Sequence, residues 1–202
     1  MSVAEKLQRS DNQVSRFYDR QKQRYIVTVL PGAQYVSSDP EEIVVTVLGS
    51  CVAACIWDSQ SRIGGLNHFM LPNDDAGLWS GASLALRFGN HAMDALINDL
   101  LQLGAEKHRL NCKFFGGGNV VQGMGKVGSK NALFAKEYAA VERLNVAKMD
   151  LGGERGRRIM FEPVTGRAWR KFLDPVAGLE VIRQEAEFVP EKKAELGSVE
   201  LF

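Results

Sequence analysis

The sequence predicts a layered α+β fold with two main helices. Runs of apolar and β-branched residues with the length of strands cluster in the first and last parts of the chain. Two longer runs with helical spacing lie between them. Because strands and helices are grouped and do not alternate strictly, this order favours an α+β layered domain over a doubly wound one.

The length and composition predict a single folded domain with an additional segment at each end. A chain of 202 residues, 45% of them hydrophobic, can build one substantial core. We expect residues 1–24 to form a polar N-terminal extension and residues 25–175 to form the domain. Residues 176–202 mix charges with isolated apolar groups, and we expect a charged C-terminal tail there.

The strands of the first half are predicted by β-branched runs that end at turn residues. These runs are 24–30, 43–47, 52–57 and 63–71. The run 52–57 is apolar throughout, as in a strand buried on both faces. A turn at 58–61 separates it from the run 63–71, so we expect a hairpin that brings Cys51 toward His68.

Residues 90–103 and 130–144 have apolar side chains at helical spacing, and Gly104 stands where a helix C-cap belongs. Polar or glycine-rich segments at 73–80 and 119–128 predict loops. Further strands are predicted at 110–115, 146–151, 157–161 and 167–172.

Charge and cysteine content exclude several classes of protein. The 25 basic and 24 acidic residues give a net charge of +1, so the charge balance gives no indication of nucleic-acid binding. Three cysteines, an odd number, argue against a disulfide framework and favour a reducing compartment. The N-terminus lacks the apolar core of a signal peptide, and no run is long enough to span a bilayer. We therefore expect a cytoplasmic protein without membrane insertion.

A thiol that follows one predicted strand and an imidazole within another point to nucleophilic chemistry. Cys51 comes directly after Gly49 and Ser50, whose backbone N–H groups could stabilise an oxyanion. A cysteine needs a neighbouring base to become a thiolate, and His68 can serve. Thr46, on the preceding strand, could accept the second ring N–H of that histidine.

Other readings of these residue types remain open. Cys55 and Cys112 lie within apolar runs and are expected to be core residues. A zinc site built from Cys51, Cys55, His68 and Cys112 lacks the closely spaced ligand pairs of structural zinc sites, so we expect no metal. The glycine turn 116–118 is either a tight strand exit or, with Phe115 as an aromatic lip, part of the active site.

Four blocks, in order along the chain, carry a family resemblance. They are Thr46-Val-Leu-Gly-Ser-Cys51-Val-Ala, Gly64-Gly-Leu-Asn-His68-Phe-Met-Leu-Pro72, Lys113-Phe-Phe-Gly-Gly-Gly-Asn119, and Asp150-Leu-Gly-Gly153 with Gly156-Arg-Arg158 and Phe161. From about residue 28 to 172 the chain resembles the CheD family, the chemoreceptor glutamine deamidases of bacterial chemotaxis.

The resemblance implies a layered α/β sandwich with mixed sheets, similar to bacterial toxin deamidases. It implies hydrolysis of receptor glutamines to glutamates through a thioester on Cys51, with His68 and Thr46 completing the triad and no cofactor. Gly49 and Ser50 would supply oxyanion contacts, and Phe115, Gly116 and Asn119 would bind substrate. The implied partners are the cytoplasmic helices of methyl-accepting chemotaxis receptors and a CheC-like phosphatase.

Two alternatives stay open at this point. One is a different cysteine acyl hydrolase or transferase, such as a protease or a transglutaminase, which shares the acyl-enzyme step. The other is a binding module without catalysis that regulates a chemotaxis phosphatase.

Overall fold

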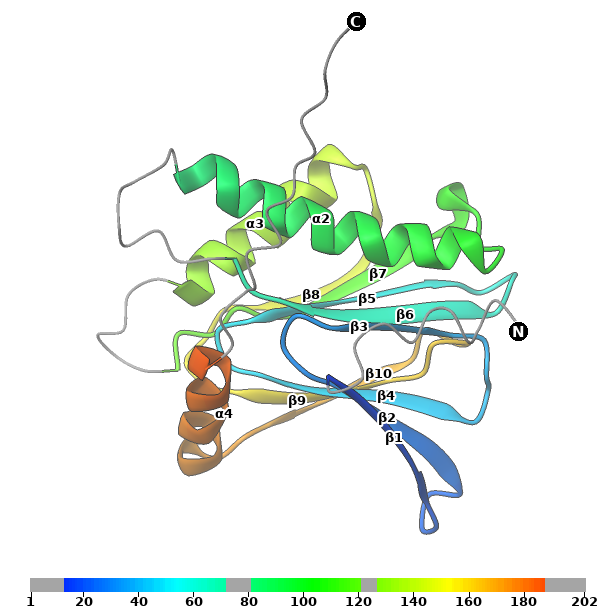
Figure 1. Ribbon diagram of the computed structural model, residues 1–202, viewed down its shortest axis with the longest axis horizontal. Helices are drawn as coiled ribbons and strands as arrows, with labels where there is room; N and C mark the ends of the chain where they lie inside the picture. The colour runs from blue at the N-terminus through cyan, green and yellow to red at the C-terminus, as the bar shows by residue number, and fades with distance from the viewer. Residues whose placement is uncertain (1–12, 72–80, 121–126, 188–202) are drawn as a thin grey trace, which may run out of the picture.

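The computed structural model describes residues 13–71, 81–120 and 127–187, and its ten strands form two five-stranded sheets. Figure 1 shows two helices covering the outer face of one sheet, with the other sheet stacked on the opposite face. Three layers result: helices, second sheet, first sheet. The α+β class is confirmed.

The first sheet has the order β1-β2-β4-β9-β10. Its strands are β1 (Val14–Asp19), β2 (Arg24–Val29), β4 (Glu42–Leu48), β9 (Arg157–Phe161) and β10 (Ala168–Phe172). The pair β2–β4 is parallel, whereas β4–β9 and the two outer pairs are antiparallel. This sheet is therefore mixed.

The second sheet has the order β3-β6-β5-β7-β8. Its strands are β3 (Gln34–Ser37), β6 (Ile63–Phe69), β5 (Val52–Asp58), β7 (Asn111–Gly116) and β8 (Asn145–Leu151). All seven residues of both β5 and β6 are buried, because these central strands are covered on both faces. The predicted hairpin of β5 and β6 is confirmed, with Ala53 paired to His68.

Helices α2 (Gly81–Gln102) and α3 (Val127–Val141) pack on the second sheet, and a 3-10 turn, η1 (Lys107–Arg109), follows α2. We predicted that α2 would begin at Asn90, but it begins nine residues earlier. Gly89, which reads as a helix breaker, is needed there because a Cβ would lie 2.4 Å from the ring of Phe134 in α3. Close packing of the two helices overrides the local preference.

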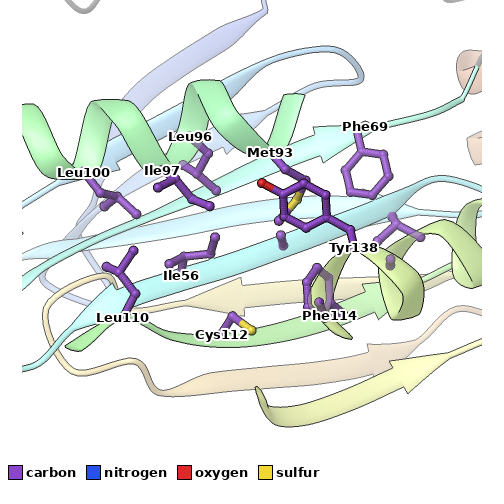
Figure 2. Packing of buried hydrophobic residues seen from close by; sticks show 14 of the residues in the cluster. Ile56, Phe69, Met93, Leu96, Ile97, Leu100, Leu110, Cys112, Phe114 and Tyr138 are labelled. Carbon is purple, nitrogen blue, oxygen red and sulfur yellow. The ribbon is translucent and has the colours of Figure 1, made fainter. Parts of the chain in front are cut away.

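The buried apolar residues form two main cores, one on each side of the second sheet. Figure 2 shows the helix-side core, in which Met93, Leu96 and Leu100 of α2 meet Ile56 and Phe114 of the sheet. The inter-sheet core contains Val27, Val44, Leu48, Cys51, Ala53, Cys55, Leu66, Phe115, Ile159 and Phe161, among others. The inter-sheet core surrounds the predicted site.

Both terminal segments contain structure that the sequence pattern did not predict. The described part of the predicted N-terminal extension includes β1, an edge strand whose inner four residues are exposed. The predicted C-terminal tail begins with helix α4 (Pro175–Glu187), which lies at one end of the sandwich (orange in Figure 1). Within the described residues, no helix has the length and apolarity that crossing a bilayer requires.

Candidate active site

Cys51 lies in the turn by which the chain crosses from one sheet to the other. Strand β4 of the first sheet ends at Leu48 and β5 of the second begins at Val52, so Gly49, Ser50 and Cys51 form the whole connection. The predicted place of the cysteine, at the glycine-flanked edge of its strand, is confirmed.

The glycine turn after β7 holds this connection by its backbone. The N–H of Gly117 donates to the carbonyl of Cys51 at 2.7 Å, and that of Gly118 donates to the carbonyl of Gly49 at 2.9 Å. At Gly116, where φ is +115°, a Cβ would lie 2.1 Å from the carbonyl oxygen of Cys51. Only glycine permits this approach, so the turn supports the backbone of the nucleophile.

The structure places the three predicted substrate-binding residues differently. Phe115 is 4% exposed and lies in the inter-sheet core, away from any exposed rim. Gly116 contacts the Cys51 backbone, as described above. The side-chain amide of Asn119 donates to Ser129 Oγ at 2.9 Å, and its buried Oδ1 has no hydrogen-bond partner among the described residues. A role of these three residues in substrate binding stays a prediction.

The two sheets bring Thr46 and His68 together in the inter-sheet core. Thr46 Oγ1 lies 2.8 Å from His68 Nδ1 and 2.7 Å from the carbonyl oxygen of Val29. The threonine has one hydroxyl hydrogen, and it is donated to Val29, because a carbonyl can only accept. The Nδ1 of His68 must then carry the hydrogen that Thr46 accepts. The Nε2 atom is left with a free lone pair, as a general base requires.

The imidazole of His68 and the nucleophile belong to one buried cluster. Cys51 Sγ, a ring nitrogen of His68 and a carboxylate oxygen of Glu185 all lie within 4.8 Å of one another, and all three residues are buried. His68 Nε2 is buried and has no hydrogen-bond partner within the described ranges. An imidazole lone pair within a few ångströms of a thiol is the arrangement that proton transfer from the thiol needs.

Glu185 comes from α4, 134 residues after the cysteine. Its Oε1 accepts the N–H groups of Gly49 at 2.7 Å and Cys51 at 3.2 Å. Its Oε2 accepts both the N–H and the hydroxyl of Ser50, each at 2.8 Å. Three successive N–H groups therefore converge on one anionic group, as in a backbone nest, and Oε1 lies 3.9 Å from His68 Nε2.

Both reactive groups are neutral in this arrangement. Burial, reinforced by the Glu185 carboxylate, raises the pKa of the Cys51 thiol well above its usual value. Burial lowers the pKa of His68 to about 4, although the same carboxylate opposes this shift. A thiol and an imidazole that are both uncharged are a resting pair, not the ion pair that attacks a carbonyl.

A metal ion does not suit this cluster. Among the described residues, only Cys51, His68 and Glu185 have ligand atoms close enough together, so Cys55 and Cys112 do not join them. The Glu185 oxygens already accept four hydrogen bonds. A cation there would face the positive ends of three N–H dipoles.

Comparison with known proteins covers almost the whole chain. The family model described as CheD chemotactic sensory transduction matches residues 70–172. A probable chemoreceptor glutamine deamidase CheD of Rhodopseudomonas palustris (strain BisA53) is 44% identical over 94% of this chain and 90% of its own length. The chain belongs to the CheD family.

Other CheD relatives extend the similarity. Proteins with the same name from Vibrio vulnificus (strain YJ016) and Hahella chejuensis are 44% and 40% identical, over 93% and 94% of this chain and 92% and 90% of theirs. Because these alignments span nearly the entire chain, they take in the segment from Thr46 to His68, which precedes the match to the CheD family model.

Two solved structures show a remote likeness to this CheD chain. A Neisseria meningitidis protein assigned to family model DUF152 has a TM-score of 0.34 at 10% identity, over 67% of this chain and 61% of its own. The C-terminal domain of CNFy from Yersinia pseudotuberculosis has a TM-score of 0.30 at 8% identity, over 80% and 73%.

Sequence reasoning missed two polar residues of the site. Asn131 of α3 is fully buried: its side-chain amide donates to the carbonyl of Ser50, and its Oδ1 accepts the N–H of Leu71, each at 2.9 Å. It thereby ties the nucleophile turn to the segment after His68. Glu185 is the other. Both occupy the buried stripe of a helix, so a polar residue at an apolar position was the available signal.

Proposed function

We propose that this chain hydrolyses the side-chain amide of selected glutamines in chemoreceptors, which converts them to glutamate residues and releases ammonia. The proposal rests on one observation: Thr46 Oγ1 lies 2.8 Å from Nδ1 of His68, and a ring nitrogen of that histidine lies within 4.8 Å of the Cys51 sulfur. Membership of the CheD family and the name of its relatives supply the substrate class.

The chemistry follows from the positions of these groups. Nε2 of His68 takes the proton of Cys51, and the thiolate attacks the glutamine Cδ. N–H groups of Gly49, Ser50 and Cys51 stabilise the oxyanion, each of them worth about 3 kcal/mol in comparable sites. Protonated His68 gives its proton to the departing nitrogen, which leaves as ammonia. Water, deprotonated by His68, then cleaves the thioester, so the net reaction consumes one water for each ammonia.

The decisive test uses a purified receptor cytoplasmic fragment and peptide mass mapping. Wild-type protein should add about one dalton to particular glutamine-containing peptides and release ammonia in equal amount. Cys51→Ala should abolish both, with an activity loss of several orders of magnitude, because the covalent route is removed. A Cys51→Ala protein that deamidates at the wild-type rate would rule out the thioester.

The same reaction mixture separates the enzymatic alternatives. A protease would shorten the receptor fragment, and a transglutaminase would crosslink it or attach an added amine. Ammonia release with intact, uncrosslinked fragment supports a deamidase. A protein that binds partners and leaves the mass of every receptor peptide unchanged would instead be the non-catalytic module.

A CheC-like phosphatase and a cytoplasmic location complete the proposal, both on family resemblance. Calorimetric titration of the phosphatase with the purified chain should give saturable binding. Fractionation of cells should recover the chain in the cytosol, where receptor signalling helices are located. A titration without heat change would argue against the phosphatase as a partner. Recovery of the chain in another compartment would argue against the cytoplasmic location.

A further inference from the structure

Helix α4 directs one side of its surface into the active site. It begins after Asp174, whose Oδ1 accepts the N–H of Ala177 at 2.9 Å and so caps the first turn. Its buried or half-buried stripe recurs at the spacing i, i+3, i+4, i+7 and consists of Gly178, Val181, Ile182 and Glu185. The last residue of this stripe is the only charged one.

The helix packs closely against the glycines of the nucleophile turn and of the segment before β9. A Cβ on Gly49 would lie 2.6 Å from Cδ1 of Ile182 and 3.0 Å from Oε2 of Glu185. At the other end of the helix, a Cβ on Gly156 would lie 3.4 Å from the Cα of Gly178. The surface beside Cys51 is therefore shaped to receive a helix that carries one polar side chain.

Glu185 has the same side chain as the product of glutamine hydrolysis. Its carboxylate accepts the N–H groups of Gly49, Ser50 and Cys51, which are the donors that the proposed mechanism assigns to the oxyanion. Its Oε1 faces Nε2 of His68 at 3.9 Å. A product glutamate just released from the thioester would make the same contacts.

We propose that α4 is an autoinhibitory helix, whose Glu185 occupies the active site of its own chain as a mimic of the glutamate product. This inference rests on the proposed function, because Glu185 resembles the product only if the reaction yields a glutamate side chain. It adds that the described state is closed, and that a receptor glutamine enters only after α4 leaves.

The contacts of α4 suit a helix that can leave. The stripe defined above contains two apolar side chains larger than alanine, Val181 and Ile182. The opposite face of the helix is open to solvent, with Val176 78% and Leu179 54% exposed. The hydrogen bonds of the Glu185 carboxylate therefore form a large part of the attachment. Because α4 follows directly after β10, it can swing away without disturbing either sheet.

Closure also accounts for the inert state of the nucleophile. The Cys51 side chain is fully buried with α4 in place, and a buried thiol beside a carboxylate resists ionisation. Departure of α4 removes both the cover and the negative charge. The same event that opens the substrate position therefore activates the thiol.

The first test compares Glu185→Ala with Gln184→Ala, a matched control on the same helix whose side chain is exposed. Two quantities are measured: the rate of Cys51 alkylation by iodoacetamide and kcat/KM for a receptor fragment. Mass spectrometry of the Cys51 peptide separates that thiol from Cys55 and Cys112. We expect both quantities to rise about tenfold or more in Glu185→Ala and to stay at the wild-type level in Gln184→Ala, because one lost charge-assisted hydrogen bond suffices for such a factor.

Alkylation of Cys51 that is as slow in Glu185→Ala as in wild type would overturn the proposal. A fall in kcat/KM in that variant would also overturn it, because Glu185 would then be a working part of the site. If no variant deamidates any receptor fragment, the proposed function fails, while the alkylation rates still decide whether α4 covers the thiol.

The second test places a substrate side chain in the same position. In Glu185→Gln, the site should hydrolyse the introduced side-chain amide and restore glutamate, with a mass gain of about one dalton in the α4 peptide. The rate should not depend on protein concentration, and the double variant Cys51→Ala/Glu185→Gln should show no gain. If the introduced amide persists in a variant that deamidates receptor fragments normally, α4 does not occupy the substrate position.

Discussion

Replacing Thr46 by valine tests most directly how the imidazole of His68 is held. The two side chains have nearly the same shape, and the site is fully buried. The change removes the hydroxyl that lies 2.8 Å from His68 Nδ1 and 2.7 Å from the carbonyl of Val29.

The magnitude follows from the loss of one buried hydrogen-bonding group, which costs about 1–3 kcal/mol. Applied to the orientation and tautomer of the catalytic base, this corresponds to a fall in kcat of about 5- to 150-fold. KM should change little, because Thr46 lies in the inter-sheet region and does not meet substrate. The free energy of unfolding should fall by a similar amount, about 1–3 kcal/mol.

The assay measures ammonia release from a receptor fragment over a range of pH, beside urea denaturation. Thr46→Ser keeps the hydroxyl and serves as the control, with kcat within a few-fold of wild type. The kinetic pKa of the base should move in Thr46→Val and stay in place in Thr46→Ser. A Thr46→Val protein that is less stable yet keeps the wild-type kcat and pH profile would show that Thr46 is only a core residue.

Three further outcomes are expected. The free energy of unfolding should fall by up to about 3 kcal/mol as the pH drops from about 6.5 to about 4. The reason is that His68 takes up a proton in the unfolded chain, whereas burial in the folded protein lowers its pKa to about 4. Urea denaturation measures this fall, which should be smaller in His68→Asn. Gly64→Ala should cost about 1–3 kcal/mol, since its Cβ would lie 2.3 Å from the carbonyl oxygen of Pro163; an unchanged melting temperature would contradict this. Arg157→Ala should cost about 1–3 kcal/mol, because the carbonyls of Asp150 and Gly152 lose their donor while Asp150 keeps its ion pair with Arg170, and calorimetry measures it.

Local sequence patterns predicted the central strands because strands that are buried on both faces consist of continuous apolar runs. The apolar run 52–57 could be covered on both faces only in the middle of a layered fold, and all of β5 is buried. The edge strands β1 and β3 escaped prediction for the opposite reason. β3 (Gln34–Ser37) mixes polar and apolar residues and owes its conformation to pairing with β6, so its own sequence carries little signal.

Helix α4 escaped prediction because its buried stripe is short and ends in a glutamate. A charged residue reads as solvent-exposed in a sequence, and Glu185 becomes buried only because three backbone N–H groups receive it. Those donors belong to a turn as many as 136 residues away. No pattern within the helix contains that information.

The amino-acid order by itself determined which groups could react: a cysteine after a glycine at a strand edge, a histidine on the partner strand of the hairpin, and a threonine on the strand before. The tertiary structure alone decided their state. The packing of the two sheets on each other set the hydrogen-bond direction from His68 through Thr46 to Val29. The docking of α4 put a carboxylate on the N–H groups beside Cys51. Proton positions and ionisation depend on distances between segments remote in the chain, and only the folded arrangement fixes those distances.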